Sequence, residues 1–171
     1  SQQTEVSLYH PDEKVRQEAS DYVSLMTPVV KSLFTDLAME ITSDAMQIHG
    51  GYGYTKDQGI EQLYRDNRIT PIYEGTNSVQ AADLVFRKLS NKNGNIINKF
   101  LEQVKSECSS KNEKIEPFIS EFNNHLSILE KFSDWMIDKA KTEKDDVSAA
   151  ANDYLKTLGS VSIAVSYTHL T

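Results

Sequence analysis

The sequence predicts an all-α protein, and three observations support this class. Apolar residues recur at three- and four-residue spacings along most of the 171 residues, which is the pattern of amphipathic helices. The 7 glycines and 4 prolines supply few turn signals, so long helices are favoured over many short strands. No stretch of useful length alternates between apolar and polar residues, as a half-buried strand would.

The composition argues against several classes of function. A formal charge of −7 and a pI near 5.1 disfavour binding to nucleic acids or to an anionic membrane surface, because both need clustered cations. No run approaches the ~18 apolar residues of a membrane span, so no membrane-spanning helix is expected. Cys108 is alone, which excludes an intrachain disulfide. The 4 histidines lack the spacing of metal ligands, so no metal site is predicted.

Two helices are expected in the first 50 residues. The first should start at Pro11, because proline suits the first helical turn and the acidic residues after it complement the helix dipole. Thr27 and Pro28 then predict a cap and the start of a second helix over residues 28–49. The apolar stripe of this second helix is wide enough to be buried on more than one side, as in a helical bundle.

Glycines and prolines divide the middle of the chain. Gly50 and Gly51 end the second helix, since a glycine just past the last turn can adopt the left-handed cap. A loop over residues 52–58 leads to a short helix over residues 59–68. Pro71 prevents its continuation, because the residue before a proline avoids helical backbone.

A further helix is predicted from about Asn77 to Leu89, after a tight connector over residues 72–75. Its start has two candidate caps. Asn77 forms a capping-box pattern with Gln80, and Thr76 is the alternative.

The clearest break in the chain is the polar, asparagine-rich stretch of residues 90–95, which is typical of a linker. We therefore divide the chain into a helical domain of residues 1–90 and an additional helical domain of residues 91–171. Three helices are expected in the second domain, and Trp135 is assigned to its core. The apolar positions of the first two of these helices are Ile96, Ile97, Phe100, Leu101 and Val104, then Ile115, Phe118, Ile119, Phe122, Leu126, Leu129, Phe132, Met136 and Ala140.

Glu74 is the candidate catalytic residue. On chemistry alone, a carboxylate at the start of a helix is more often a cap or a partner of the helix dipole. The large apolar residues Ile72 and Tyr73 precede it, however, and Gly75 after it would let a ligand approach the backbone closely. A carboxylate in an apolar pocket can serve as a general base. The residues alone leave both interpretations open.

A second candidate feature is the run from Gln47 through His49, Gly50 and Gly51 to Gly53. The simple interpretation is a helix end with spare glycines, because the spacing matches neither a phosphate loop nor a dinucleotide fingerprint. The functional interpretation is that exposed backbone amides and the glutamine amide meet a cofactor.

Residues 45–89 resemble the C-terminal helical domain of the acyl-CoA dehydrogenases. The stretch contains two separate motifs of that family at the family's spacing, the glycine run after Gln47 and the Tyr-Glu-Gly-Thr sequence around Glu74. The preceding helix is also similar, so the resemblance covers roughly Pro11 to Leu89. It implies a four-helix bundle, further domains upstream and FAD as cofactor. The extension after Ser90 resembles a larger subgroup with an added helical domain, which includes the methylmercaptopropionyl-CoA dehydrogenases.

The resemblance implies a role for each residue of the second motif. Glu74 would take the α-proton of an acyl-CoA thioester while the flavin takes the β-hydride, which leaves a trans-2-enoyl-CoA. The backbone amide of Glu74 would help to polarise the thioester carbonyl, and Gly75 would lie against the substrate. Thr76 and Ser78 match positions that contact FAD, although Ser78 stands where the family commonly has glutamine.

The first motif implies an assembly. Gln47, Gly50 and Gly51 match residues that meet the FAD of a neighbouring subunit, so a homo-oligomer is expected. The implied function is FAD-dependent acyl-CoA dehydrogenation with electron-transfer flavoprotein as the electron acceptor.

Two alternatives stay open: an acyl-CoA oxidase that uses oxygen, and a helical assembly module without catalysis. We expect the chain to be a fragment, truncated at both ends and inactive alone. We place the enzyme in the bacterial cytoplasm or the mitochondrial matrix, with the cytoplasm favoured.

Overall fold

The computed structural model describes residues 2–89, 94–108 and 116–168, and every element in these ranges is helical. The predicted all-α class is confirmed. Within the described ranges, no helix combines the length and the apolar character needed to cross a membrane. The elements are α1 (Gln2–Tyr9), α2 (Glu13–Ile48), η1 (Gly50–Tyr54), η2 (Lys56–Gln58), α3 (Ile60–Asn67), α4 (Asn77–Asp83), the π-helical η3 (Leu84–Leu89), α5 (Asn95–Cys108), α6 (Glu116–Lys139) and α7 (Lys144–Thr168).

Helix α2 runs for 36 residues straight through Pro28, so the predicted break at Thr27 and Pro28 is wrong. An interior proline costs about 3 kcal/mol, because it lacks an N–H and crowds the preceding turn. Pro28 is buried, and Leu25 and Val29 on either side are fully buried in the core. Burying each of these two apolar side chains contributes about 1.5–3 kcal/mol. Tertiary packing on both sides of the proline therefore outweighs the local preference for a break.

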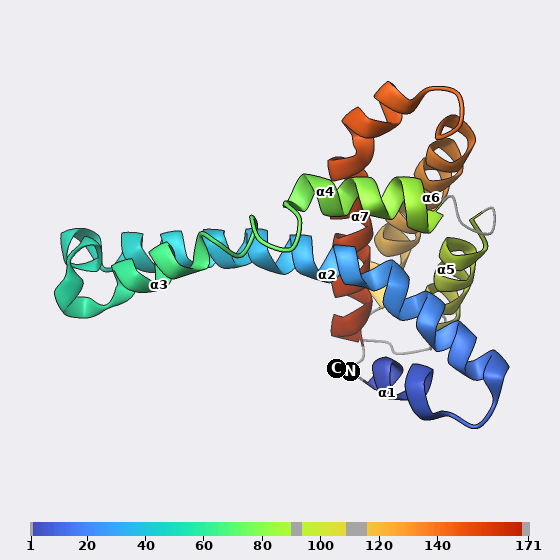
Figure 1. The fold of residues 1–171 in the computed structure, drawn as a ribbon, viewed down its shortest axis with the longest axis horizontal. Coiled ribbons are helices and arrows are strands. Elements are labelled where there is room, and N and C mark those ends of the chain that lie inside the picture. The colour runs from blue at the N-terminus through green and yellow to red at the C-terminus, as the bar shows by residue number, and fades with distance from the viewer. Residues whose placement is uncertain (1, 90–93, 109–115, 169–171) are drawn as a thin grey trace.

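The helices pack in two crossing layers at one end of the molecule (Figure 1). Helix α2 and the α4–η3 helix lie along the long axis, and α5, α6 and α7 lie across them. Their shared core is one cluster that draws on residues before and after residue 90. The division into domains at residue 90 stays a prediction. The largest side chains that are fully buried in this core are Tyr154, Leu25, Leu84, Leu89, Ile97, Leu126, Leu129, Met136, Leu155 and Leu158.

The C-terminal half of α2 forms an arm that projects from this core, with η1, η2 and α3 folded back along it (Figure 1). We expected the apolar stripe of α2 to be buried on more than one side. In the described chain this is wrong for the arm, where Phe34 and Ile41 are exposed and Ile48 is 84% exposed. The short α3 and its connectors cover part of this half of α2, and α4 and α7 contact it at Lys31, Leu33 and Asp36, which leaves these apolar side chains uncovered.

The apolar stripe predicted for α5 is confirmed, because its five members are all buried. The assignment of Trp135 to the core is wrong: its side chain is 37% exposed, while Phe132 beside it packs against the core. Residues 90–93 of the predicted linker, and Ile115 of the predicted second stripe, lie outside the described residues.

Helix α7 crosses α2 at Gly159, where an added Cβ would lie 2.8 Å from Leu33 Cδ2 and 3.3 Å from Val29 Cγ1. We expect Gly159→Val to lower the free energy of unfolding by about 1–3 kcal/mol, because a branched side chain would overlap Leu33 and force the packing at the crossing to rearrange. Chemical denaturation measures the change. Ser160→Val makes a similar substitution at the next, exposed position and should change stability by less than about 0.5 kcal/mol. Equal effects of the two variants would contradict the close crossing.

Tyr154 lies in the centre of the core, with its hydroxyl 2.8 Å from Ser133 Oγ and its ring edge-on to Phe132. Burial raises the pKa of Tyr154 far above its ordinary value, mainly because the phenolate would lose its hydration. The folded state therefore holds this proton more tightly than the unfolded state. The resulting stability is complete below pH ~10, the pKa of tyrosine in an unfolded chain, and is lost as the pH rises above it.

We therefore expect the wild-type chain to lose about 1 kcal/mol more stability between pH 10 and pH 11 than Tyr154→Phe, which has no proton to lose at this position. Urea denaturation at the two pH values measures the difference. Identical pH dependence of the two proteins would show that the Tyr154 hydroxyl is not held neutral by burial.

Candidate functional site

The connector before α4 has an unusual backbone at two successive residues. Glu74 has a φ of 55° and Gly75 a φ of 83°, both in the left-handed region, and a non-glycine residue rarely adopts this conformation. Thr76 then caps α4, with its hydroxyl accepting a hydrogen bond from the Val79 amide at 3.4 Å. Thr76, the alternative in the sequence, is therefore the cap, and the predicted capping box of Asn77 and Gln80 is wrong.

Asn77 instead points back to α2, because it is the first residue of α4 and its side chain is free for a tertiary contact. Its amide nitrogen lies 2.7 Å from Asp36 Oδ1 and 3.0 Å from Thr35 Oγ1. Lys31 Nζ donates to Asn77 Oδ1 and to the Gly75 carbonyl, each at 2.8 Å. Sequence reasoning missed these contacts, since they join residues more than 40 positions apart and no local pattern marks them.

The carboxylate side of Glu74 is open in the described chain. Glu74 is exposed, and Ile72 and Tyr73 are 45% and 50% exposed. The apolar residues before Glu74 therefore form no closed pocket around it by themselves. The glutamate is held through its backbone, because Gln80 Nε2 donates to the Glu74 carbonyl at 2.8 Å.

The glycine run lies at the far end of the arm. Helix α2 ends at Ile48, and Gly50 follows with a left-handed φ of 57°, as the sequence predicts. Gln47, Gly50 and Gly51 are exposed, and a Cβ at either glycine would meet no atom within 4 Å. The backbone here is open to a ligand. Such a donor set, one side-chain amide and bare backbone, can hydrogen-bond the polar parts of a nucleotide.

The structure does not bring the two motifs together. Lys31, which contacts the Glu74 loop, lies 16 positions before Gln47 on the same helix. At 1.5 Å per residue the two groups are about 24 Å apart along the helix axis. Thr76 and Ser78 lie beside Glu74, and both are exposed. The candidate site residues therefore form two separate groups on one chain.

The C-terminal extension reaches the group around Glu74. Helix α7 packs against α4, and Asn152 Nδ2 lies 3.4 Å from Ser78 Oγ. Ser78 is thus a contact of the extension in this chain.

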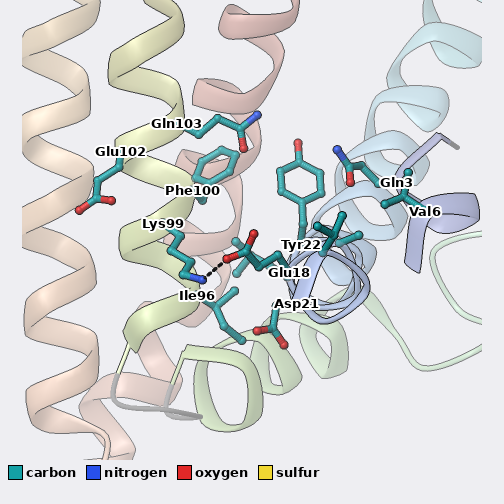
Figure 2. Close-up of a pocket in the computed structure, with 13 residues that line it drawn as sticks. Gln3, Val6, Glu18, Asp21, Tyr22, Ile96, Lys99, Phe100, Glu102 and Gln103 are labelled. Carbon is teal, nitrogen blue, oxygen red and sulfur yellow. Dashed lines mark hydrogen bonds and ion pairs between the residues drawn. The ribbon is translucent and has the colours of Figure 1, made fainter. Parts of the chain in front are cut away.

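A cavity of about 460 Å³ lies between α1, α2 and α5 (Figure 2). Its walls combine apolar side chains with the ion pair of Glu18 and Lys99, whose charged atoms are 2.9 Å apart. The other carboxylates of its lining are Asp21 and Glu102. The cavity is at the N-terminal end of α2, away from both candidate groups, and no predicted site residue lines it.

Comparison with known proteins gives the family. Residues 12–89 match the family described as "Acyl-CoA dehydrogenase, C-terminal domain". This stretch, less than half of the chain, is similar to the C-terminal domain of the acyl-CoA dehydrogenases. It contains the Glu74 loop, the glycine run and the part of the core that α2, α4 and η3 supply. The resemblance that the two motifs indicate is confirmed.

Relatives by sequence carry related names. The chain is 42% identical over 95 residues to the 3-methylmercaptopropionyl-CoA dehydrogenase of Ruegeria pomeroyi, an alignment that covers 56% of this chain and 16% of that protein. It is 33% identical over 110 residues to the butyryl-CoA dehydrogenase of Syntrophomonas wolfei, covering 64% and 18%. The chain thus spans less than a fifth of the length of these relatives.

Two solved structures share the fold. Caenorhabditis elegans ACDH-11, solved in complex with C11-CoA, has a TM-score of 0.70 and 25% sequence identity, and the match covers 84% of this chain and 24% of that one. Bd2924 in its apo-form has a TM-score of 0.66 and 22% identity, over 90% and 27% of the two chains. Both matches extend well beyond residues 12–89, so the fold of the extension is also shared with solved proteins.

Gly75 in the acyl-CoA dehydrogenase loop should resist substitution. We expect Gly75→Ala to destabilise the protein by about 1–2 kcal/mol, because an alanine with this φ is strained and its Cβ would lie 3.2 Å from Val79 Cγ1. Gly51→Ala is the matched control, since Gly51 has no positive φ and open space at its Cβ position. Thermal or chemical denaturation of both variants measures the effect. A stable Gly75→Ala protein would show that the left-handed backbone is not required.

Proposed function

We propose that this chain is part of an FAD-dependent acyl-CoA dehydrogenase in which Glu74 takes the α-proton of an acyl-CoA thioester. The observation that carries the proposal is the position of Glu74 within the matched domain. It lies on a loop in which the carbonyl groups of Glu74 and Gly75 accept hydrogen bonds from other side chains. A base must be held in one place relative to the proton it removes. The carboxylate, by contrast, is exposed and available to a ligand.

The chain's own residues have separable tasks in this proposal. The Glu74 carboxylate accepts the α-proton, and the Glu74 backbone amide donates a hydrogen bond to the thioester carbonyl, which stabilises the charge that develops there. Gly75 lies against the substrate, where a side chain would intrude. FAD, when bound, supplies the hydride acceptor for the β-carbon, and the product is a trans-2-enoyl-CoA.

The cofactor contacts are divided between two groups of residues. Thr76 and Ser78 would contact the FAD that serves Glu74 of the same chain. Gln47, Gly50 and Gly51 match the family motif that meets the FAD of a neighbouring subunit, so they would contact a second FAD; their separation of about 24 Å along a single helix is compatible with this. A homo-oligomer follows from this division. The polar, uncharged character of both groups fits the ribose and adenine parts of the cofactor.

The remaining proposals concern the whole polypeptide. We propose that the chain works within a longer protein, since its relatives are more than five times as long as the aligned segments. The 3-methylmercaptopropionyl-CoA and butyryl-CoA named for the relatives indicate an acyl-CoA substrate. Electron-transfer flavoprotein is the proposed electron acceptor, and the cytoplasm the proposed location.

Substitution of the proposed base tests the assignment. In the full-length enzyme we expect Glu74→Gln to lower kcat by about 10²–10⁴-fold, because the amide cannot accept the α-proton. Bleaching of flavin absorbance by acyl-CoA measures the reaction, and the absorbance before substrate addition shows that FAD is still bound. Glu40→Gln, an exposed glutamate on α2, is the matched control and should react at the wild-type rate. Near-normal bleaching by Glu74→Gln would exclude Glu74 as the base.

A further inference from the structure

We propose that Lys31 is a positioning residue for Glu74: its ammonium group clamps the loop to α2 and thereby sets the direction of the glutamate side chain. This inference rests on the proposed role of Glu74 as base. Neither the family match nor the named relatives assign a function to Lys31.

The loop needs an external support because of its backbone. Glu74 and Gly75 are both left-handed, with φ values of 55° and 83°, and a glutamate does not adopt this conformation by preference. The direction of the Glu74 side chain depends on this backbone, since a return to an ordinary φ would turn its Cβ away. Contacts that fix the Glu74 and Gly75 peptides therefore also fix the carboxylate.

Two side chains, from different helices, supply these contacts. Gln80, on the helix that follows the loop, donates to the Glu74 carbonyl at 2.8 Å. Lys31, on α2, donates to the next carbonyl, that of Gly75, at 2.8 Å. Lys31 thus ties a carbonyl group of the loop itself to α2. The start of α4 is tied to the same helix through Asn77 and Asp36.

The lysine is itself held in place. Its Nζ also donates to Asn77 Oδ1 at 2.8 Å, and the Asn77 amide nitrogen reaches Asp36 Oδ1 at 2.7 Å. Asn77 thus links the cation of Lys31 to the anion of Asp36, which lies five residues further along α2. Lys31 is half-buried, which limits the competition of water for these hydrogen bonds.

The fold does not depend on this clamp. Helix α4 and the following η3 are anchored separately, because Ala81 and Leu84 are completely buried and α7 packs against both elements. Loss of the ammonium group should therefore loosen the loop without unfolding the domain. A positioning role and a role in global stability can be separated by experiment.

The test compares Lys31→Met with the wild type in the full-length enzyme, because methionine keeps most of the apolar stem and removes the donor. We expect kcat to fall by about 100-fold while KM stays within about threefold, since a misplaced base slows proton abstraction more than it weakens binding. The kinetic isotope effect on kcat with α-deuterated acyl-CoA should rise, because abstraction becomes more strongly rate-limiting. Lys31→Arg keeps a cationic donor and should recover part of kcat.

Amide hydrogen exchange of residues 73–77 gives a readout that does not depend on turnover. In Lys31→Met, the amides of this segment should exchange faster than in the wild type, and the amides elsewhere should exchange at the wild-type rate. Lys14→Met, an exposed lysine on the same helix, should change neither exchange nor kcat. If Lys31→Met does not fold, Asn77→Ala removes the other end of the clamp and is measured in the same way.

Each outcome decides the inference. Faster exchange together with a lower kcat and a larger isotope effect supports it. Unchanged exchange, or faster exchange with unchanged kcat, overturns it. If Glu74→Gln remains active, the proposed function is rejected, and the exchange data still show whether Lys31 clamps the loop.

Discussion

The unbroken course of α2 through Pro28 is the constraint on which the other features depend. One helix face, with Leu25, Val29 and Ser32, is buried against the crossing helices. The adjacent face carries Lys31, which reaches the Glu74 loop. A break at Pro28 would change the relative rotation of the two halves of the helix, so the core and the loop contacts could not both form. The burial around Pro28 therefore stabilises the site as well as the fold.

Much of the fold could be predicted from apolar periodicity. The stripe of α5 and the left-handed glycine after α2 were predicted correctly, because each depends on neighbours within a few residues. The continuation of α2 through Pro28 could not be predicted. It depends on packing against α7, which lies more than 100 residues further along the chain, and local propensity at Thr27 and Pro28 points the other way.

The candidate site, like the fold, could be predicted from the sequence only where local residues determine it. Sequence could indicate Glu74 as a candidate, and the family resemblance could give it a role, but chemistry alone favoured a helix cap. The cap proved to be Thr76, two positions later. The sequence could not show how the loop is supported. Asn77 matches a capping pattern, but its side chain hydrogen-bonds to Asp36 on α2 instead. A polar side chain at a helix start can either cap the helix or hydrogen-bond to another element, and the tertiary structure decides which of the two forms.

The length of α2 also fixes how the two motifs can act. A single helix holds its ends at a set distance, so Gln47 cannot approach the Glu74 loop by a small adjustment of side chains. Within one chain the two groups of candidate residues are therefore too far apart to contact the same part of one ligand. Two apolar residues between the groups, Phe34 and Ile41, lie on the same arm and are exposed. Exposure of these apolar side chains to water is unfavourable, and contact with a partner surface would remove that free-energy cost. The exposed apolar arm therefore supports the proposed homo-oligomer, while the Glu74 loop is supported within this chain.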